Sequence, residues 1–245
     1  LKDRKVTEAY TEYPECLNVV SDSAGNTLVI KQKDFISCYS HEIGSFQDIH
    51  VQGMDEEVSK ALFAYGERQF VVLDAEGCLL EIRPDFDSFP FTLDMKKSPI
   101  HEKGIDRAYY SEGVLYYVDV ENHFYSYSMK DRTKEYLGDL TGWVNKYGKL
   151  SRIALFHSDP YLAFRNGLLL NIHNQEEALG LDVGLFCVLP DRKQDILWVG
   201  TDGQGVRMYY DKYNRFSGIQ LKNLPIVMRN PVRSIYTEDG KTLWF

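Results

Sequence analysis

Hydrophobic and polar residues alternate along most of the chain in runs of strand length. Near the C-terminus, apolar runs cover residues 185–189, 196–201, 206–210 and 216–220, and the polar segments between them carry Asp191, Asp202 to Gly205 and Asp211 to Asn214. A period of two is typical of β-strands, and aspartate, asparagine and glycine favour tight turns. This segment is therefore predicted to form four consecutive antiparallel strands.

The same pattern recurs upstream. Residues 106–110, 114–119, 123–128 and 133–137 form a second set of four predicted strands, rich in β-branched and aromatic side chains. Equivalent anchor positions lie 35–47 residues apart, with a mean of 43, at Leu28, Phe70, Leu115, Leu162, Leu197 and Leu243. A four-stranded propeller blade takes roughly 40–45 residues.

The sequence thus predicts an all-β fold, a β-propeller of four-stranded antiparallel blades. At this spacing residues 1–245 hold about five to six blades in a single propeller domain or part of one. The last residues, Leu243, Trp244 and Phe245, fall inside a predicted second strand, which would leave an open sheet edge. We therefore expect the chain to be a fragment of a larger, seven-bladed propeller.

Helical signal is thin. Residues 54–65 could form one helix, but they occupy the place of a first strand, so we expect a polar loop followed by a strand at 60–65, with a short helical turn at 55–59 as the alternative. Residues 175–179 could form another turn. Neither changes the all-β prediction.

Composition narrows the function classes. The 245 residues include 28 Lys and Arg against 36 Asp and Glu, a net charge of −8, which argues against a nucleic-acid partner or an anionic membrane surface. No apolar run is long enough for a membrane span, and no signal peptide is visible at the N-terminus. Cys16, Cys38, Cys78 and Cys187 match no zinc motif; we expect small buried side chains, with a Cys16–Cys38 disulfide as the alternative.

The C-terminal units resemble a known family, the two-component-regulator propeller repeat. Its pattern of Leu-Trp, Gly-Thr, paired glycines and Tyr-Asp is matched in one unit by Trp198, Gly200, Thr201, Gly203, Gly205, Tyr210 and Asp211, and in the next by Val232, Arg233, Ser234, Ile235, Asp239, Gly240, Leu243 and Trp244. The match is specific over the last 60 or so residues. Upstream the Trp198 position is taken by Val71, Tyr116 and Ala163.

This resemblance implies a function. Proteins with such repeats are periplasmic sensor regions of hybrid two-component histidine kinases of Bacteroides-type bacteria, which act in signal transduction and commonly sense oligosaccharides. The expected location is the periplasm, as part of an inner-membrane receptor, with dimerisation through the full-length receptor. This chain would then be no enzyme, because the kinase would lie outside it.

Other site chemistry is less favoured. The run Gly200 to Gly205 joins two predicted strands, whereas a dinucleotide site needs its glycines ahead of a helix, so a simple turn is expected and no cofactor. No catalytic elbow or His-Glu-x-x-His motif is present. Asp119, Glu121 and Asn122 could hold calcium, but we expect a solvated turn and no metal. A propeller glycosidase or lyase, with acids such as Asp106 and Glu238, remains an alternative.

A sugar site is the sharper hypothesis. Pyranose rings stack on aromatic side chains, and sugar hydroxyls pair with planar polar groups. In a propeller, the turns between second and third strands and the connections between blades share one face. The candidates on that face are Trp143, which we place in a loop, and Asn122, His123, Arg165, Asn166, Asp202, Gln204, Arg229 and Asn230. For each the simpler interpretation is an exposed loop tip or a loop anchor. The remaining alternative is an interaction scaffold whose loops bind another protein.

Overall fold

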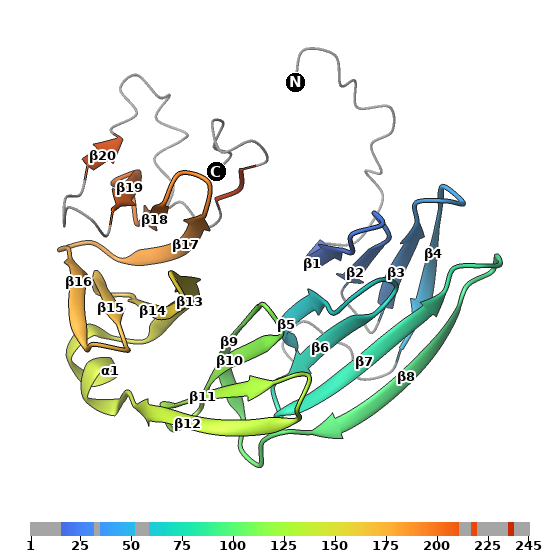
Figure 1. Ribbon diagram of the computed structural model, residues 1–245, viewed down its shortest axis with the longest axis horizontal. Coiled ribbons are helices and arrows are strands. Elements are labelled where there is room, and N and C mark those ends of the chain that lie inside the picture. The colour runs from blue at the N-terminus through green and yellow to red at the C-terminus, as the bar shows by residue number, and fades with distance from the viewer. Residues whose placement is uncertain (1–15, 32–34, 52–58, 211–216, 220–234, 238–245) are drawn as a thin grey trace. The chain divides into compact units, whose positions relative to one another are not determined.

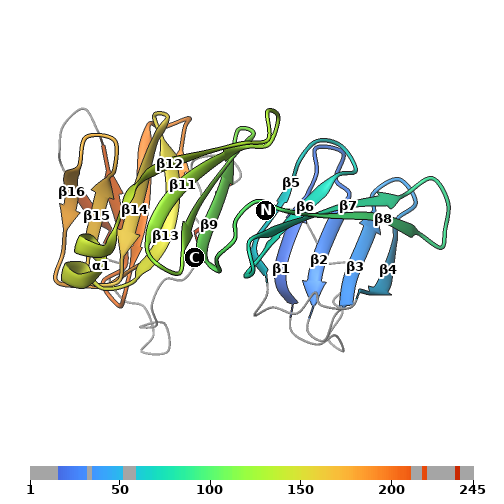
Figure 2. The same ribbon diagram turned by 90° about the horizontal axis from the view of Figure 1, so that it is seen from below.

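The computed structural model describes residues 16–31, 35–51, 59–210, 217–219 and 235–237. Within these residues the chain forms five four-stranded antiparallel sheets and one short helix (Figures 1 and 2). In every sheet the strands are hydrogen-bonded in chain order. Each sheet is a propeller blade, and its strands are lettered A to D below.

The bounds of the strands follow the chain. Blade 1 comprises β1 (Cys16–Ser21), β2 (Thr27–Lys31), β3 (Phe35–Ser40) and β4 (Ser45–His50). Blade 2 comprises β5 (Ser59–Ala64), β6 (Phe70–Asp74), β7 (Cys78–Asp85) and β8 (Thr92–Pro99). Blade 3 comprises β9 (Ile105–Ser111), β10 (Val114–Asp119), β11 (His123–Ser128) and β12 (Thr133–Asp139).

After the helix α1 (Thr141–Tyr147), blade 4 comprises β13 (Leu150–Phe156), β14 (Asp159–Phe164), β15 (Leu168–Asn171) and β16 (Glu176–Gly180). Blade 5 comprises β17 (Leu185–Asp191), β18 (Ile196–Thr201), β19 (Val206–Tyr209) and β20 (Ser217–Ile219).

The chain divides into two compact units, residues 1–104 and residues 105–245. In the first unit, β1 contacts β5, and one apolar cluster joins blades 1 and 2, including Leu28, Ile36, Phe70 and Ile82. Because B strands are buried on both faces, they read as continuous apolar runs, as in β6, which is buried throughout.

In the second unit the A strands β9, β13 and β17 neighbour one another in turn. One apolar cluster, with Phe124, Leu150 and Phe164, joins blades 3 and 4, and another, with Leu169, Leu185 and Leu197, joins blades 4 and 5. Trp198 is buried with Ile196 and Val206, and Ile235 packs against them. The role of Trp198 is therefore blade packing.

The predicted all-β propeller fold is confirmed, and β10, β11 and β18 have the predicted bounds. The first five anchors begin or lie within B strands, while Leu243 lies outside the described residues. The single-domain assignment and the expected larger ring stay predictions. Residues 175–179 do not form an isolated turn: the strand β16 starts at Glu176, because its backbone completes the fourth edge of blade 4. Cys38 is a free, buried thiol, so the alternative disulfide with Cys16 is wrong.

Candidate functional site

The B–C turns of blades 3 and 4 share one backbone design. Each closes with a hydrogen bond from the fourth residue to the first, Asn122 N–H to Asp119 O (3.1 Å) and Gly167 N–H to Phe164 O (3.2 Å). The fourth residue is left-handed, with φ of 69° at Asn122 and 96° at Gly167. Glycine and asparagine adopt this conformation at least cost, so the turn geometry alone accounts for Asn122.

These turns hold the connection to the next blade. The carbonyl oxygen of Asn122 accepts the N–H of Leu140 (2.9 Å), and that of Gly167 accepts the N–H of Leu181 (3.0 Å). A Cβ added at Gly167 would lie 1.8 Å from the Leu181 carbonyl oxygen, so only glycine fits there. B–C turns and D–A connections therefore lie along one edge of the second unit, which we call the rim: residues 119–123, 140–149, 165–167, 181–184 and 202–205.

Trp143 lies in α1, not in the loop that the sequence predicted. The Trp143 ring stacks on Tyr147 with centroids 6.0 Å apart, and Trp143, Val144 and Tyr147 pack on the cluster between blades 3 and 4. The Tyr147 hydroxyl donates to Glu177 of β16 (2.6 Å), which places the helix at the end of blade 4 (Figure 1). A helix of seven residues, about two turns, is unstable alone, and this packing stabilises it. Trp143 thus anchors the helix while keeping part of its ring exposed.

The helix and the Arg165–Asn166 turn meet. The N–H of Asn166 donates to the Tyr147 carbonyl oxygen, and the N–H of Arg165 donates to that of Lys149, both at 3.0 Å. A Cβ at Gly148 would lie 3.2 Å from Asn166 Oδ1. Both residues of the turn are exposed. The structure therefore joins the end of the helix that carries Trp143 to the turn that carries Arg165 and Asn166.

The rim continues into blade 5. The Arg165 carbonyl oxygen lies 2.6 Å from the place a Cβ would take on Gly184, and the Gly184 carbonyl oxygen accepts the N–H of Asp202 (2.8 Å). Asp202 and Gln204 are exposed, and Gln204 Oε1 accepts a bond from Arg207 Nη2 (3.3 Å). This glycine-rich segment joins β18 to β19, as expected of a simple turn.

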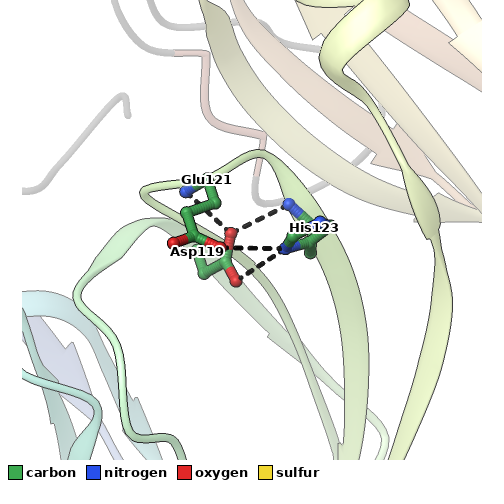
Figure 3. Close-up of side chains that lie close together, drawn as sticks. All are labelled: Asp119, Glu121 and His123. Carbon is green, nitrogen blue, oxygen red and sulfur yellow. Dashed lines mark hydrogen bonds and ion pairs between the residues drawn. The ribbon is translucent and has the colours of Figure 1, made fainter.

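His123 lies at the other end of the rim, in a carboxylate environment (Figure 3). Asp119 is fully buried, and its Oδ1 accepts the backbone N–H groups of Glu121 and His123, both at 2.9 Å. His123 Nδ1 lies 3.3 Å from Asp119 Oδ2 and 3.7 Å from Glu121 Oε2. The aspartate therefore fixes the turn with one oxygen and faces the imidazole with the other.

Acid–base groups elsewhere are engaged in local contacts. Hydrogen bonds from Thr141, whose backbone N–H lies 2.7 Å from Asp139 Oδ1, hold the pKa of Asp139 below its usual range. Asp106, an acid considered for a glycosidase, lies on β9 beside Arg107 Nη1 (3.4 Å). Burial raises the pKa of Cys38 to about 12 and that of Cys187 to about 11, so neither is a nucleophile at neutral pH. Arg229, Asn230 and Glu238 lie outside the described residues.

Comparison with known proteins identifies the fold. No family model matches the chain, and no curated protein does. Among solved structures, the extracellular domain of a protein described as a one-component system of B. thetaiotaomicron matches 95% of the chain with TM-score 0.64 and 14% identity. That of a protein described as a hybrid two-component system of B. thetaiotaomicron matches 97% with TM-score 0.61 and 16% identity. The computationally designed Ika8 protein matches 92% of this chain and 78% of its own, with TM-score 0.58 and 10% identity.

The chain spans about a third of the two bacterial structures, 31% and 33% of their lengths. At these identities the likeness establishes the fold. Among the described residues, the only helix, α1, is far too short to cross a membrane.

Proposed function

We propose that the chain is a non-catalytic, extracytoplasmic sensor domain of a hybrid two-component receptor, and that its rim binds an oligosaccharide. The observation that carries the sugar site is the junction of α1 with the Arg165–Asn166 turn. The stacked, partly exposed rings of Trp143 and Tyr147 lie in the helix whose C-terminal end is hydrogen-bonded to the turn of exposed Arg165 and Asn166. Aromatic faces bind the apolar face of a pyranose, and planar polar groups bind its hydroxyls.

Two independent observations support the receptor class. The chain shares its fold with two extracellular domains of B. thetaiotaomicron proteins described as signalling systems. In sequence, Trp198, Gly200 and Thr201 on β18 match the two-component-regulator repeat. A fold alone does not determine a function, so the repeat and the site carry the argument together.

Signal transfer would occur without deformation of a blade. The second unit packs its blades through continuous apolar clusters, and close-packed cores transmit strain rather than absorb it. Ligand binding at the rim would therefore change the arrangement of rigid bodies, such as two receptor protomers in the periplasm. The homodimer belongs to the full-length receptor in this proposal.

Calorimetric titration of the chain with a panel of dietary and host oligosaccharides tests the proposal. We expect one glycan class to bind, and Asn166→Ala and Arg165→Ala each to weaken binding about tenfold, the scale of a lost hydrogen bond to a charged or polar group. Arg192→Ala is the matched control, because Arg192 is an exposed arginine in the A–B turn of blade 5, at the opposite end of its sheet.

Three outcomes would change the assignment. If an intact receptor ectodomain binds none of the glycans, the sugar part is wrong. If the chain retains a protein partner and shows no thermal shift with small ligands, it is an interaction scaffold. If the purified chain releases reducing ends from a polysaccharide, it is a glycosidase or lyase.

A further inference from the structure

Three side chains with metal-ligating atoms converge at the B–C turn of blade 3 (Figure 3). The nearest ligand atoms of Asp119, Glu121 and His123 all lie within 4.8 Å of one another. Asp119 is fully buried, whereas the side chains of His123 and Glu121 are 31% and 50% exposed. The cluster therefore has one fixed ligand and an open path to solvent.

The corresponding turn of blade 2 already holds a cation. Asp74 Oδ1 accepts the backbone N–H groups of Glu76 (3.0 Å) and Cys78 (2.8 Å), as Asp119 does for Glu121 and His123. The ammonium of Lys97 then lies 3.0 Å from Asp74 Oδ2 and 3.8 Å from Glu76 Oε2. Two carboxylates in this turn geometry thus bind a positively charged group.

Blade 3 has the same two carboxylates but no lysine at the position that corresponds to Lys97. Lys97 is paired with Leu80, two residues after Cys78 on β7. The same place on β12, paired with Tyr125 two residues after His123, belongs to Tyr136. The lysine of blade 2 is thus replaced by an aromatic residue, while an imidazole takes the position of Cys78.

We propose that Asp119, Glu121 and His123 bind a divalent transition-metal ion, with Zn²⁺ the best fit, at the place that the Lys97 ammonium occupies in blade 2. Two ligands of a tetrahedral zinc ion, with bonds of about 2.0–2.1 Å, lie about 3.3–3.4 Å apart. The separation of His123 Nδ1 and Asp119 Oδ2 is 3.3 Å, and exposed Glu121 needs only a change of rotamer. A mixed imidazole and carboxylate set suits zinc better than calcium.

The surrounding bonds orient the ligands. Both backbone N–H groups donate to Asp119 Oδ1, and Oδ2 faces His123 Nδ1 at the proposed metal position. The ion would replace the proton between Nδ1 and Oδ2, and that proton would pass to solvent or Nε2. Three protein ligands leave a fourth position for water or for a ligand oxygen.

The test is calorimetric titration of the metal-stripped full chain with ZnCl₂, and of the same chain with CoCl₂ followed by visible absorption. We expect the chain to bind one equivalent of Zn²⁺ tightly. Bound Co²⁺ should give a visible spectrum typical of a low coordination number. His123→Ala should weaken Zn²⁺ binding about a hundredfold and Glu121→Ala about tenfold. Removing a residue that only orients a metal ligand already costs about 10- to 100-fold in metal affinity, so the loss of a direct ligand should cost at least as much. His123→Gln, which keeps a polar side chain, serves if the alanine variant folds poorly.

Two controls separate this site from surface binding. Glu76→Ala removes the equivalent carboxylate of blade 2, and His157→Ala removes an exposed histidine that pairs with Asp195; both should leave Zn²⁺ affinity unchanged. Absence of a strong equivalent, or binding that survives His123→Ala and Glu121→Ala, would overturn the inference. The oligosaccharide titration of Asn166→Ala involves none of these ligands, so the two proposals fail separately.

Discussion

The B–C turns of blades 2 and 3 are built alike and used differently. In both turns, Oδ1 of a buried aspartate, Asp74 or Asp119, accepts the backbone N–H groups of the residues two and four positions later in the chain. The second oxygen meets the ammonium of Lys97 in blade 2 and the imidazole of His123 in blade 3. The comparison shows that the Oδ1 atom of the aspartate forms the turn in both blades, whereas the partner of Oδ2 differs between them.

A third copy of the motif extends the lesson. In the A–B turn of blade 1, Asp22 Oδ1 accepts the N–H groups of Ala24 and Asn26. Its Oδ2 accepts Asn26 Nδ2 (3.0 Å) and the N–H of Arg68 in blade 2 (2.9 Å). Here the second oxygen joins two blades. One backbone device thus serves as a blade junction, an ion pair or a candidate metal ligand.

The largest effect should come from removing the shared atom. Asp119→Ala leaves the N–H groups of Glu121 and His123 without their acceptor, which should lower the free energy of unfolding by about 2–4 kcal/mol. Asp74→Ala should cost a similar amount, because its Oδ1 has the same role. Urea denaturation followed by circular dichroism measures both, with exposed Asp131→Ala as the control. A cost below about 0.5 kcal/mol for either turn would break the equivalence.

Asp22→Asn should come next, at about 1–3 kcal/mol, because an amide nitrogen would face two N–H donors. Burial acts to raise the pKa of Asp22, but the bonds from Arg68, Asn26 and Ala24 outweigh it and lower the pKa. The carboxylate therefore stabilises the fold above its unfolded pKa of about 3.9, and this is lost as pH falls through the lowered folded value.

Unfolding measured from pH 6 downwards tests the predicted direction of the pH dependence of the stability that Asp22 contributes. The stability gap between the parent chain and Asp22→Asn should be constant above about pH 5 and shrink as the solution becomes more acidic. A gap that widens in acid would contradict the assignment.

Tyr136→Lys converts blade 3 toward blade 2. Tyr136 is 54% exposed and its ring lies 6.0 Å from that of His123, so a lysine there can reach the carboxylates with little change in packing. The new ammonium should compete with Zn²⁺ and weaken its binding at least tenfold, about 1.4 kcal/mol. Tyr136→Phe keeps the ring and should bind zinc normally. Equal affinities for the two variants would show that the turns are not interchangeable.

The smallest effect is expected for Lys97→Met, about 0.2–1 kcal/mol, because the lysine side chain is 55% exposed and its ion pair is screened. The hydrogen bond to Asp74 raises the pKa of Lys97. The pair therefore contributes fully below the unfolded lysine pKa of about 10.4 and is lost as pH rises through the folded value. Thermal unfolding of both chains at pH 7 and pH 11 should show a smaller difference at pH 11; a larger difference at pH 11 would contradict the assignment.

The propeller could be predicted because its signals are local. The strands β10 and β11 alternate with a period of two and meet at Asp119 and Asn122, residues that favour turns, so their bounds are visible in the sequence. The helix α1 was not predicted because a helix of about two turns has little intrinsic stability. Its signal was present, since Trp143, Val144 and Tyr147 have the spacing of one helical face.

The site was only partly predictable for a related reason. The sequence placed Arg165, Asn166 and Trp143 on one face, but their contacts run through backbone groups of Tyr147 and Lys149 that no composition reveals. Similarly, Asp119, Glu121 and His123 lie within five residues of sequence, but the sequence does not show how the turn folds. In the structure Asn122 takes the left-handed backbone conformation, and the His123 ring faces the two carboxylates.

The hydrogen bond that closes each connection onto its own B–C turn makes the propeller tolerant of insertions. Residues 181–184 pass directly from β16 to β17, whereas residues 140–149 include a helix, and both connections are fastened at their first residue by the preceding turn. The exposed residues of the longer connection can therefore be exchanged without shifting a blade, whereas Trp143, Val144 and Tyr147 pack on the cluster between blades 3 and 4. Such a position suits the evolution of new recognition surfaces, and it offers protein engineers a place to graft a binding loop.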